Sequence, residues 1–252
     1  MSGKAEISDV EVVETGKVEL KQPLAIMGFA GAGLVGGIAV SHIIDKLEMS
    51  EIAHVQSVFT SPAVVFLDGK LRQPFRIHSN REGNICAVVC EIPLPSSGVY
   101  HIARALLKWV EEKGAKELVV LDGVSARGLP KKRKAFCVAE PEKLEECEKK
   151  GVRMAHAGII RGISGSILNE CLNRKITGVA FLVPAVAFMP DIEGAVTLIE
   201  TLNDVYGLDV ETADLLSKAA DLKQKLKTVA ERHRRMRKAE ERRGDIEGTY
   251  VV

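Results

Sequence analysis

The sequence predicts an α/β protein with a three-layer α/β/α body and a helical extension at its carboxyl end. From about residue 20 to residue 207, short and nearly continuous apolar runs alternate with amphipathic ones, which is typical of strands alternating with helices. The apolar runs are rich in β-branched residues, as in strands that helices cover on both faces. After residue 207 a seven-residue repeat begins. We therefore expect a body at 1–207 and an extension at 208–252.

The elements of the body follow from these runs in chain order. Predicted strands span residues 24–30, 52–59, 85–92, 117–124 and 177–185. Predicted helices span residues 34–47, 99–113, 166–174 and 191–206. The last helix begins at Pro-Asp-Ile-Glu-Gly-Ala, where acidic side chains in the first turn interact favourably with the helix dipole. Segments 62–74 and 94–98 are rich in proline, glycine and serine and are predicted loops.

The extension carries an apolar stripe at alternating steps of four and three residues, which is the a/d pattern of a helix that packs along one seam. The stripe consists of Leu215, Ala219, Leu222, Leu226, Val229 and Met236. A helix over residues 210–243 would be roughly 50 Å long, longer than the body needs for cover. We expect it to project or to pack against copies of itself. A terminal helix lying on its own domain is the alternative.

The net charge of +1 conceals a basic extension, because residues 213–243 carry 11 Lys or Arg against 5 Asp or Glu. The densest part, 232–243, has no aromatic residue that could stack on bases, so we expect no sequence-specific nucleic-acid partner. No run approaches the roughly 20 apolar residues of a membrane span, and residues 1–17 are too acidic and polar for a signal peptide. We expect a cytoplasmic protein with no membrane partner.

The cysteines and histidines do not predict a metal site. Five cysteines form an odd set without a C-x-x-C pair, which indicates reduced thiols. The six histidines include no H-x-x-x-H pair. We expect no metal and no cofactor.

Three glycines, Gly31, Gly33 and Gly36, follow a predicted strand and open a predicted helix. In that context glycines can let backbone N–H groups bind the phosphates of a nucleotide. The acidic residue that would hold a ribose at the end of the next strand is missing, because that strand is followed by Thr60 and Ser61. Two interpretations stay open. The loop is an anion site, which would make the protein an enzyme with a nucleotide or phosphate site, or the glycines allow a tight turn and close helix packing.

Two segments come close to a G-x-S-x-G nucleophile elbow. Those at 162–166 and 123–127 begin with G-x-S but end in Ser166 and Arg127 instead of glycine. Ser164 to Ser166 could instead cap the following helix. Asp122, at the end of a predicted strand, is placed like a functional carboxylate, although an ordinary turn carboxylate is the simpler interpretation.

The chain ends in a glycine-containing spacer followed by a threonine, an aromatic residue and two aliphatic residues. They are Thr249, Tyr250, Val251 and Val252. An apolar terminus beyond a long helix predicts a docking peptide whose carboxylate a lysine or a backbone nest of a partner could bind. A tail tucked onto the body is the alternative.

Four motifs, in this order, resemble the proteasome assembly chaperone family, specifically the archaeal and bacterial relatives of its second eukaryotic subunit. They are M-G-F-A-G-A-G-L-V-G-G-I-A at 27–39, L-D-G-V at 121–124, G-I-S-G at 162–165 and P-D-I-E-G-A at 190–195. The resemblance covers roughly residues 24–225. It implies a phosphorylase- or hydrolase-like fold, no catalysis, homo-oligomers and binding to proteasome α-subunits.

The resemblance also implies a role in proteasome binding for the tail. Several proteasome activators end in a hydrophobic residue, a tyrosine and any residue, and insert this end between neighbouring α-subunits. Here Tyr250 is third from the end instead of second. Either the tail docks in a shifted register or the aromatic ring packs elsewhere.

Overall fold

The computed structural model describes residues 9–16, 19–67, 69–126, 128, 132–187 and 189–217. The chain divides into one unit at Met1–Thr212 and a second at Ala213–Val252. In the second unit the described residues, 213–217, are helical. The first unit holds the sheet and the helices that cover it.

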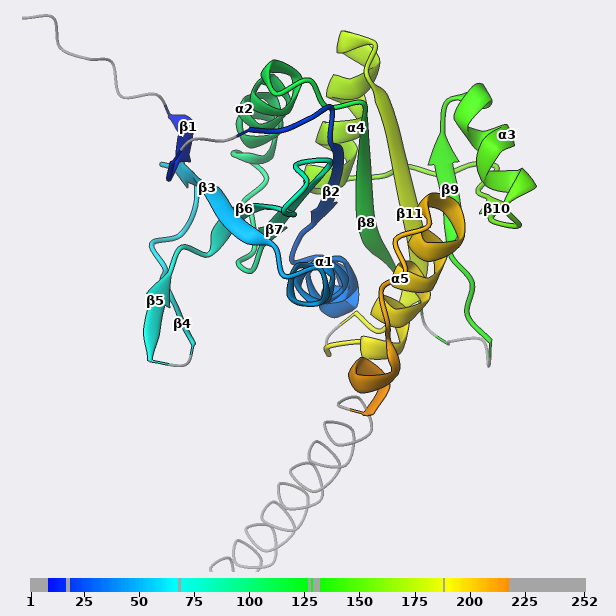
Figure 1. Cartoon of the computed structure of the whole chain (residues 1–252). Helices are drawn as coiled ribbons and strands as arrows, with labels where there is room; N and C mark the ends of the chain where they lie inside the picture. Colours follow the sequence, from blue (N-terminus) through cyan, green and yellow to red (C-terminus); the bar gives the residue numbers. More distant parts are fainter. Residues whose placement is uncertain are drawn as a thin grey trace, which may run out of the picture. The chain divides into compact units, whose positions relative to one another are not determined.

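Nine strands of the described residues form one sheet in the order β1-β3-β6-β7-β2-β8-β11-β9-β10 (Figure 1). Their bounds are β1 Val10–Glu14, β2 Leu24–Gly28, β3 Ser50–Ser57, β6 Phe75–Ser79, β7 Ile85–Cys90, β8 Glu117–Ser125, β9 Phe136–Ala139, β10 Arg153–Met154 and β11 Thr177–Ala185. The central strands β7, β2, β8 and β11 are parallel. On one side β6, β3 and β1 continue the sheet in antiparallel fashion. On the other side β9 pairs antiparallel with β11, and β10 pairs parallel with β9.

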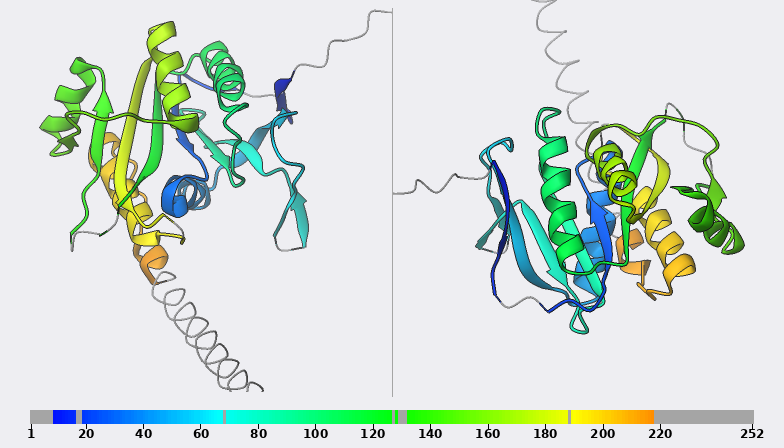
Figure 2. Two further views of the ribbon diagram at one scale, coloured as in Figure 1. Left: turned by 180° about the vertical axis from the view of Figure 1, so that it is seen from behind. Right: turned by 90° about the horizontal axis from the view of Figure 1, so that it is seen from above.

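Helices cover both faces of the sheet (Figure 2). Their bounds are α1 Val35–Lys46, α2 Val99–Glu112, α3 Pro141–Lys149, α4 Gly162–Arg174 and α5 Ile192–Tyr206. α1 packs against α5 on one face, α2 packs against α4 on the other, and α3 lies beside β9 and β10. The predicted three-layer α/β/α body is confirmed.

The central strands are buried on both faces and divide the core in two. Ala25 and Met27 of β2 pack with Ile102 and Leu106 of α2. Because side chains alternate along a strand, Ile26 points to the opposite face, where α1 and α5 lie, and it is also fully buried. The continuous apolarity of β2 thus reflects a helix layer on each side.

α1 lies unusually close to the sheet because two glycines face each other. A Cβ on Gly28 would come within 3.0 Å of the carbonyl oxygen of Gly36, and a Cβ on Gly36 would come within 3.0 Å of the carbonyl oxygen of Leu121. Real Cβ atoms essentially never lie so near backbone atoms. The position of α1 over β2 and β8 therefore requires glycine at both places.

Two expectations about the body were wrong. Segment 62–74, expected to be a loop, contains a hairpin of β4 Val65–Leu67 and β5 Lys70–Arg72. Its two prolines favour a loop, but Asp68-Gly69 between two apolar runs is itself a hairpin signal. Strand 52–59 was expected to be covered on both faces. β3 instead alternates between exposed and buried residues, as antiparallel strands near a sheet edge do.

Substitution of Gly36 by alanine should lower the free energy of unfolding by about 1–3 kcal/mol, because the new methyl group collides with the Leu121 carbonyl and α1 must move away. Gly37 is the matched control in the same helix. A Cβ there would meet its nearest atom, the carbonyl oxygen of Phe29, at 3.6 Å, an ordinary contact. Gly37→Ala should raise stability by about 0.5–1 kcal/mol. Urea unfolding of both variants measures the difference, and equal effects would contradict the close-packing argument.

Candidate functional site

Four segments meet at the carboxyl ends of β2, β8 and β11, where α/β folds place their ligands. They are the turn after β2, Asp122 in β8, the first turn of α4 and the start of α5. The hydroxyl of Ser164 in α4 donates to Asp122, and the backbone N–H of Asp191 donates to the carbonyl oxygen of Gly33 at 2.8 Å. The four motifs that resemble the chaperone family are therefore joined in one cluster.

The turn after β2 has a backbone that only glycine adopts readily. Gly33 has a φ of +65°, and a Cβ there would lie 2.9 Å from the Cβ of Asp191. A Cβ on Gly31 would collide with the carboxylate of Asp122. Leu34 follows with φ +53°, and α1 begins at Val35. In this motif Gly33 adopts a left-handed backbone conformation, and Gly31 and Gly33 leave room for Asp122 and Asp191, respectively.

Asp122 is held by short hydrogen bonds on both carboxylate oxygens. The Ser164 hydroxyl donates to Oδ2 at 2.6 Å, and the backbone N–H of Gly123 donates to Oδ1 at 2.7 Å. Burial raises the pKa of Asp122, although both hydrogen bonds act in the opposite direction. Ser164 lies inside α4, which begins at Gly162, so the expectation that Ser164 to Ser166 precede and cap that helix was wrong.

Asp191 connects the glycine turn to α5, and its side chain accepts three hydrogen bonds. Its Oδ1 accepts from Gly194 N–H at 3.0 Å, which makes it the N-cap of α5. Its Oδ2 accepts from Val186 N–H at 3.0 Å and from Arg133 Nη1 at 2.5 Å. Burial alone would raise the pKa of Asp191, but these hydrogen bonds and the charge of Arg133 hold it below its ordinary value.

Arg133 was missed at the sequence level and completes the cluster. Its side chain is 7% exposed and also donates from Nη2 to Glu193 at 2.7 Å. Burial would lower the pKa of the guanidinium, but the hydrogen bonds to Asp191 and Glu193 raise it. The only signal in the sequence is a run of four basic residues at 131–134, which does not distinguish Arg133 from its neighbours.

The contacts of this cluster favour a structural role. The carboxylates of Asp122 and Asp191 flank the glycine turn and would repel a phosphate group. Both are already bound by protein donors, and Ser164 donates its proton to a carboxylate instead of to a basic group that could activate it. The anion loop at Gly31, Gly33 and Gly36 stays a prediction, whereas the geometry favours the tight-turn interpretation.

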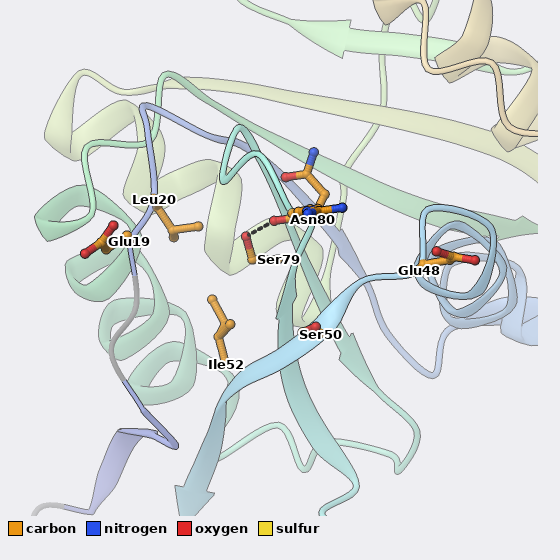
Figure 3. A pocket seen from close by; sticks show the side chains of 8 residues that line it. Glu19, Leu20, Glu48, Ser50, Ile52, Ser79 and Asn80 are labelled. Carbon is orange, nitrogen blue, oxygen red and sulfur yellow. Dashed lines mark hydrogen bonds between the residues drawn. The ribbon is translucent and has the colours of Figure 1, made fainter.

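A hollow of about 390 Å³ lies at the opposite end of the sheet, between the start of β3, the end of β6 and residues 19–20 before β2 (Figure 3). Glu19, Glu48, Ser50 and Asn80 are among its lining residues. The Asn80 amide binds the side chains of Glu82 and Asn84. These polar groups tie the turn before β7 together and do not form a nucleophile with a base.

His78 is the one residue with an unsatisfied polar atom among the buried side chains that the structure describes, at Nδ1. Burial, then the charges of Arg76 and Arg72, lowers the pKa of His78 to about 4. The ring is therefore neutral at physiological pH.

Among the described residues no group of His, Cys, Asp or Glu is arranged to hold a metal ion. Likewise, within the ranges described, no helix is long and apolar enough to cross a membrane.

The other residues singled out in the sequence fall mainly outside the described residues. The docking tail, Thr249, Tyr250, Val251 and Val252, lies outside them entirely. Of the stripe, only Leu215 is described, in the helical stretch 213–217. Ala219, Leu222, Leu226, Val229 and Met236 lie outside the described residues.

The helices on both faces of the sheet define a three-layer α/β protein. Residues of its four motifs bind one another at the carboxyl end of the sheet. The sequence profile of the PAC2 family matches residues 25–230. The chain belongs to the PAC2 family.

Similar proteins have been found in several archaea. An uncharacterized protein of Methanocaldococcus jannaschii is 29% identical over 230 residues, which cover 91% of this chain and 94% of the relative. A Thermoplasma acidophilum protein of unknown function has a crystal structure with TM-score 0.76 and 36% identity, covering 88% of this chain and 93% of that one. Pyrococcus furiosus PbaA, described as an archaeal homolog of proteasome-assembly chaperone, matches with TM-score 0.82 and 26% identity, covering 95% and 99%.

Substitution of Asp191 by asparagine should lower the free energy of unfolding at pH 7 by about 3 kcal/mol, because a buried charge pair is broken. The pKa of Asp191 is lowered in the folded state, so its stabilisation is present above about pH 4 and is lost as the pH falls through the lowered pKa. The difference between variant and parent should therefore shrink as the pH falls from 7 to below about 4. Urea unfolding across this range measures it. Asp204→Asn, on the exposed face of α5, is the control and should change little.

Asp122→Asn should behave in the opposite way. Burial raises the pKa of Asp122, so the parent loses stability as the pH rises through that raised value. Asparagine can keep both contacts, with its oxygen toward Gly123 N–H and its amide toward the Ser164 hydroxyl. We expect the variant to equal or exceed the parent in stability at pH 7 and to lack this pH-dependent loss. A variant clearly less stable than the parent at pH 7 would show that the ionised carboxylate is required.

Proposed function

We propose that this chain is a non-catalytic, homo-oligomeric assembly chaperone that binds proteasome α-subunits. The observation that carries the proposal is the structural likeness to PbaA, which extends over 95% of this chain. PbaA is described as a homolog of proteasome-assembly chaperone, and both chains have the fold of one family over nearly their whole length.

The geometry of the sheet's carboxyl end supports a role in binding. Enzymes with α/β folds place reactive groups at this end, with donors and acceptors left available for a substrate. Here Asp122 and Asp191 accept hydrogen bonds from Ser164, Arg133 and backbone N–H groups. The cluster holds together the turn after β2 and the starts of α4 and α5. In this proposal, partners therefore bind to the outer surface of the body and to the extension.

The extension supplies the partner contacts in this proposal. The stripe from Leu215 to Met236 holds copies together or supports a display helix, and the tail from Thr249 to Val252 binds between α-subunits. When several tails are held in one oligomer, each new contact is made at high effective concentration, which raises the overall affinity by about 10²- to 10⁴-fold over that of one tail. A weak tail is sufficient under these conditions.

Deletion of residues 250–252 should abolish co-purification with the proteasome α-subunits of the same organism, because the tail contacts are lost from every copy at once. The mass of the oligomer should not change. Affinity capture followed by light scattering measures both quantities. Deletion of residues 2–4, which removes three residues from the other end, is the control. Full capture after the carboxyl-terminal deletion would exclude the tail as the docking element.

A further inference from the structure

Two of the five cysteines lie together, away from the apolar core that contains the other three. Cys86, Cys90 and Cys171 belong to the core between the sheet and helices α2 and α4. Cys137 in β9 and Cys147 in α3 are also fully buried, and a hydrogen bond joins their thiols. We call Cys137 and Cys147 the thiol pair.

The backbone brings the thiol pair together through one short segment. Met154 in β10 is the register partner of Cys137, and the Ala155 N–H donates to the Cys137 carbonyl oxygen at 3.1 Å. The Cys147 carbonyl oxygen accepts from Val152 N–H, also at 3.1 Å. Residues 152–155 therefore bind the backbone at both cysteines. A disulfide requires such a close approach of two backbone segments, with the side chains directed at each other.

The two thiols differ in chemical character. Lys143, one turn before Cys147 in α3, is buried, and its ammonium group pairs with Glu117 at 3.0 Å. The hydrogen bond from Cys137 and the charge of Lys143 lower the pKa of Cys147, whereas burial and the neighbouring carboxylates act in the opposite direction. The same hydrogen bond, together with burial, raises the pKa of Cys137. Because the thiolate is the reactive form, Cys147 is the nucleophile of the pair.

Helix α3 is held to the body by few side chains. Of its nine residues, Lys143 and Cys147 are the buried ones. The helix packs on β9 and β10 at the edge of the sheet (Figure 1). Segments with so few buried contacts open locally at a low cost in free energy. Opening of α3 exposes Cys147 to a small reagent while the core between the sheet and α2 and α4 stays folded.

We propose that the thiol pair is a redox switch, in which a small-molecule disulfide oxidises Cys137 and Cys147 to an intrachain disulfide that fixes α3 to β9. The Cys147 thiolate attacks one sulfur of the reagent, and the other reagent sulfur leaves as a thiolate. The Cys137 thiol then loses its proton and attacks Cys147 Sγ, which releases the second reagent thiolate. The two protein protons end on the reagent, so two thiols are oxidised and one reagent disulfide is reduced.

The disulfide changes the local opening of α3. The new covalent ring contains only residues 137–147, so it ties the helix directly to the neighbouring strand. In the reduced chain α3 opens and closes, whereas in the oxidised chain it stays against β9. This switch is independent of the proposed function, because it needs neither a partner nor self-association.

The test treats the folded full-length chain with oxidised glutathione and then alkylates the remaining thiols in denaturant. Three of the five cysteines should be alkylated, and trypsin should release residues 135–143 linked to residues 144–149. Dithiothreitol should restore all five thiols. Hydrogen exchange of the α3 amides should be at least about tenfold slower in the oxidised chain, because local opening is restricted.

Two variants control the assignment. Cys147→Ala removes the nucleophile and should give neither the linked peptides nor the slower exchange. Cys90→Ala removes a buried thiol from the other core and should give both, as the parent does. Thermal unfolding shows whether each variant folds, and the measurement on the parent chain decides the proposal by itself. Five free thiols after treatment of the folded parent, a linkage through another cysteine, or unchanged exchange would overturn the proposal.

Discussion

The close approach of α1 to the sheet is the constraint on which the rest of the body depends. Gly28 and Gly36 let the helix lie against β2 and β8 with backbone in contact with backbone. To reach that position the chain must turn sharply after β2, through a left-handed Gly33. The turn brings the Gly33 carbonyl to the N–H of Asp191 and so fixes the start of α5, which packs on α1.

Asp122 and Asp191 lie at the end of the sheet where α/β enzymes place their catalytic groups. In this protein both carboxylates bind protein donors and hold the loops together. Desolvation of Asp191 is offset by Arg133 and by two backbone donors, whereas Asp122 has only neutral donors and its pKa is raised. Both groups bind protein atoms. The result is a rigid carboxyl end of the sheet, consistent with a molecule that works through its surfaces.

In the proposed function the extension supplies the partner contacts. The extension begins beyond α5, which ends at Gly207 in a left-handed cap. Multivalent binding depends on how many extensions one oligomer holds together.

The sequence alone determined the central strands, the helices α1, α2, α4 and α5, and the glycine turn. Buried parallel strands appear in a sequence as continuous apolar runs, and the helices that cover them appear as periodic apolar patterns. It did not reveal the hairpin, the antiparallel edge or α3, whose short and charged segments have weak patterns. Three hydrogen bonds of the cluster join residues that are far apart in the chain. They are those of Arg133 with Asp191, Ser164 with Asp122 and Asp191 with Gly33. Only the folded backbone brings such groups within hydrogen-bond distance, so only the tertiary structure decided that they bind one another.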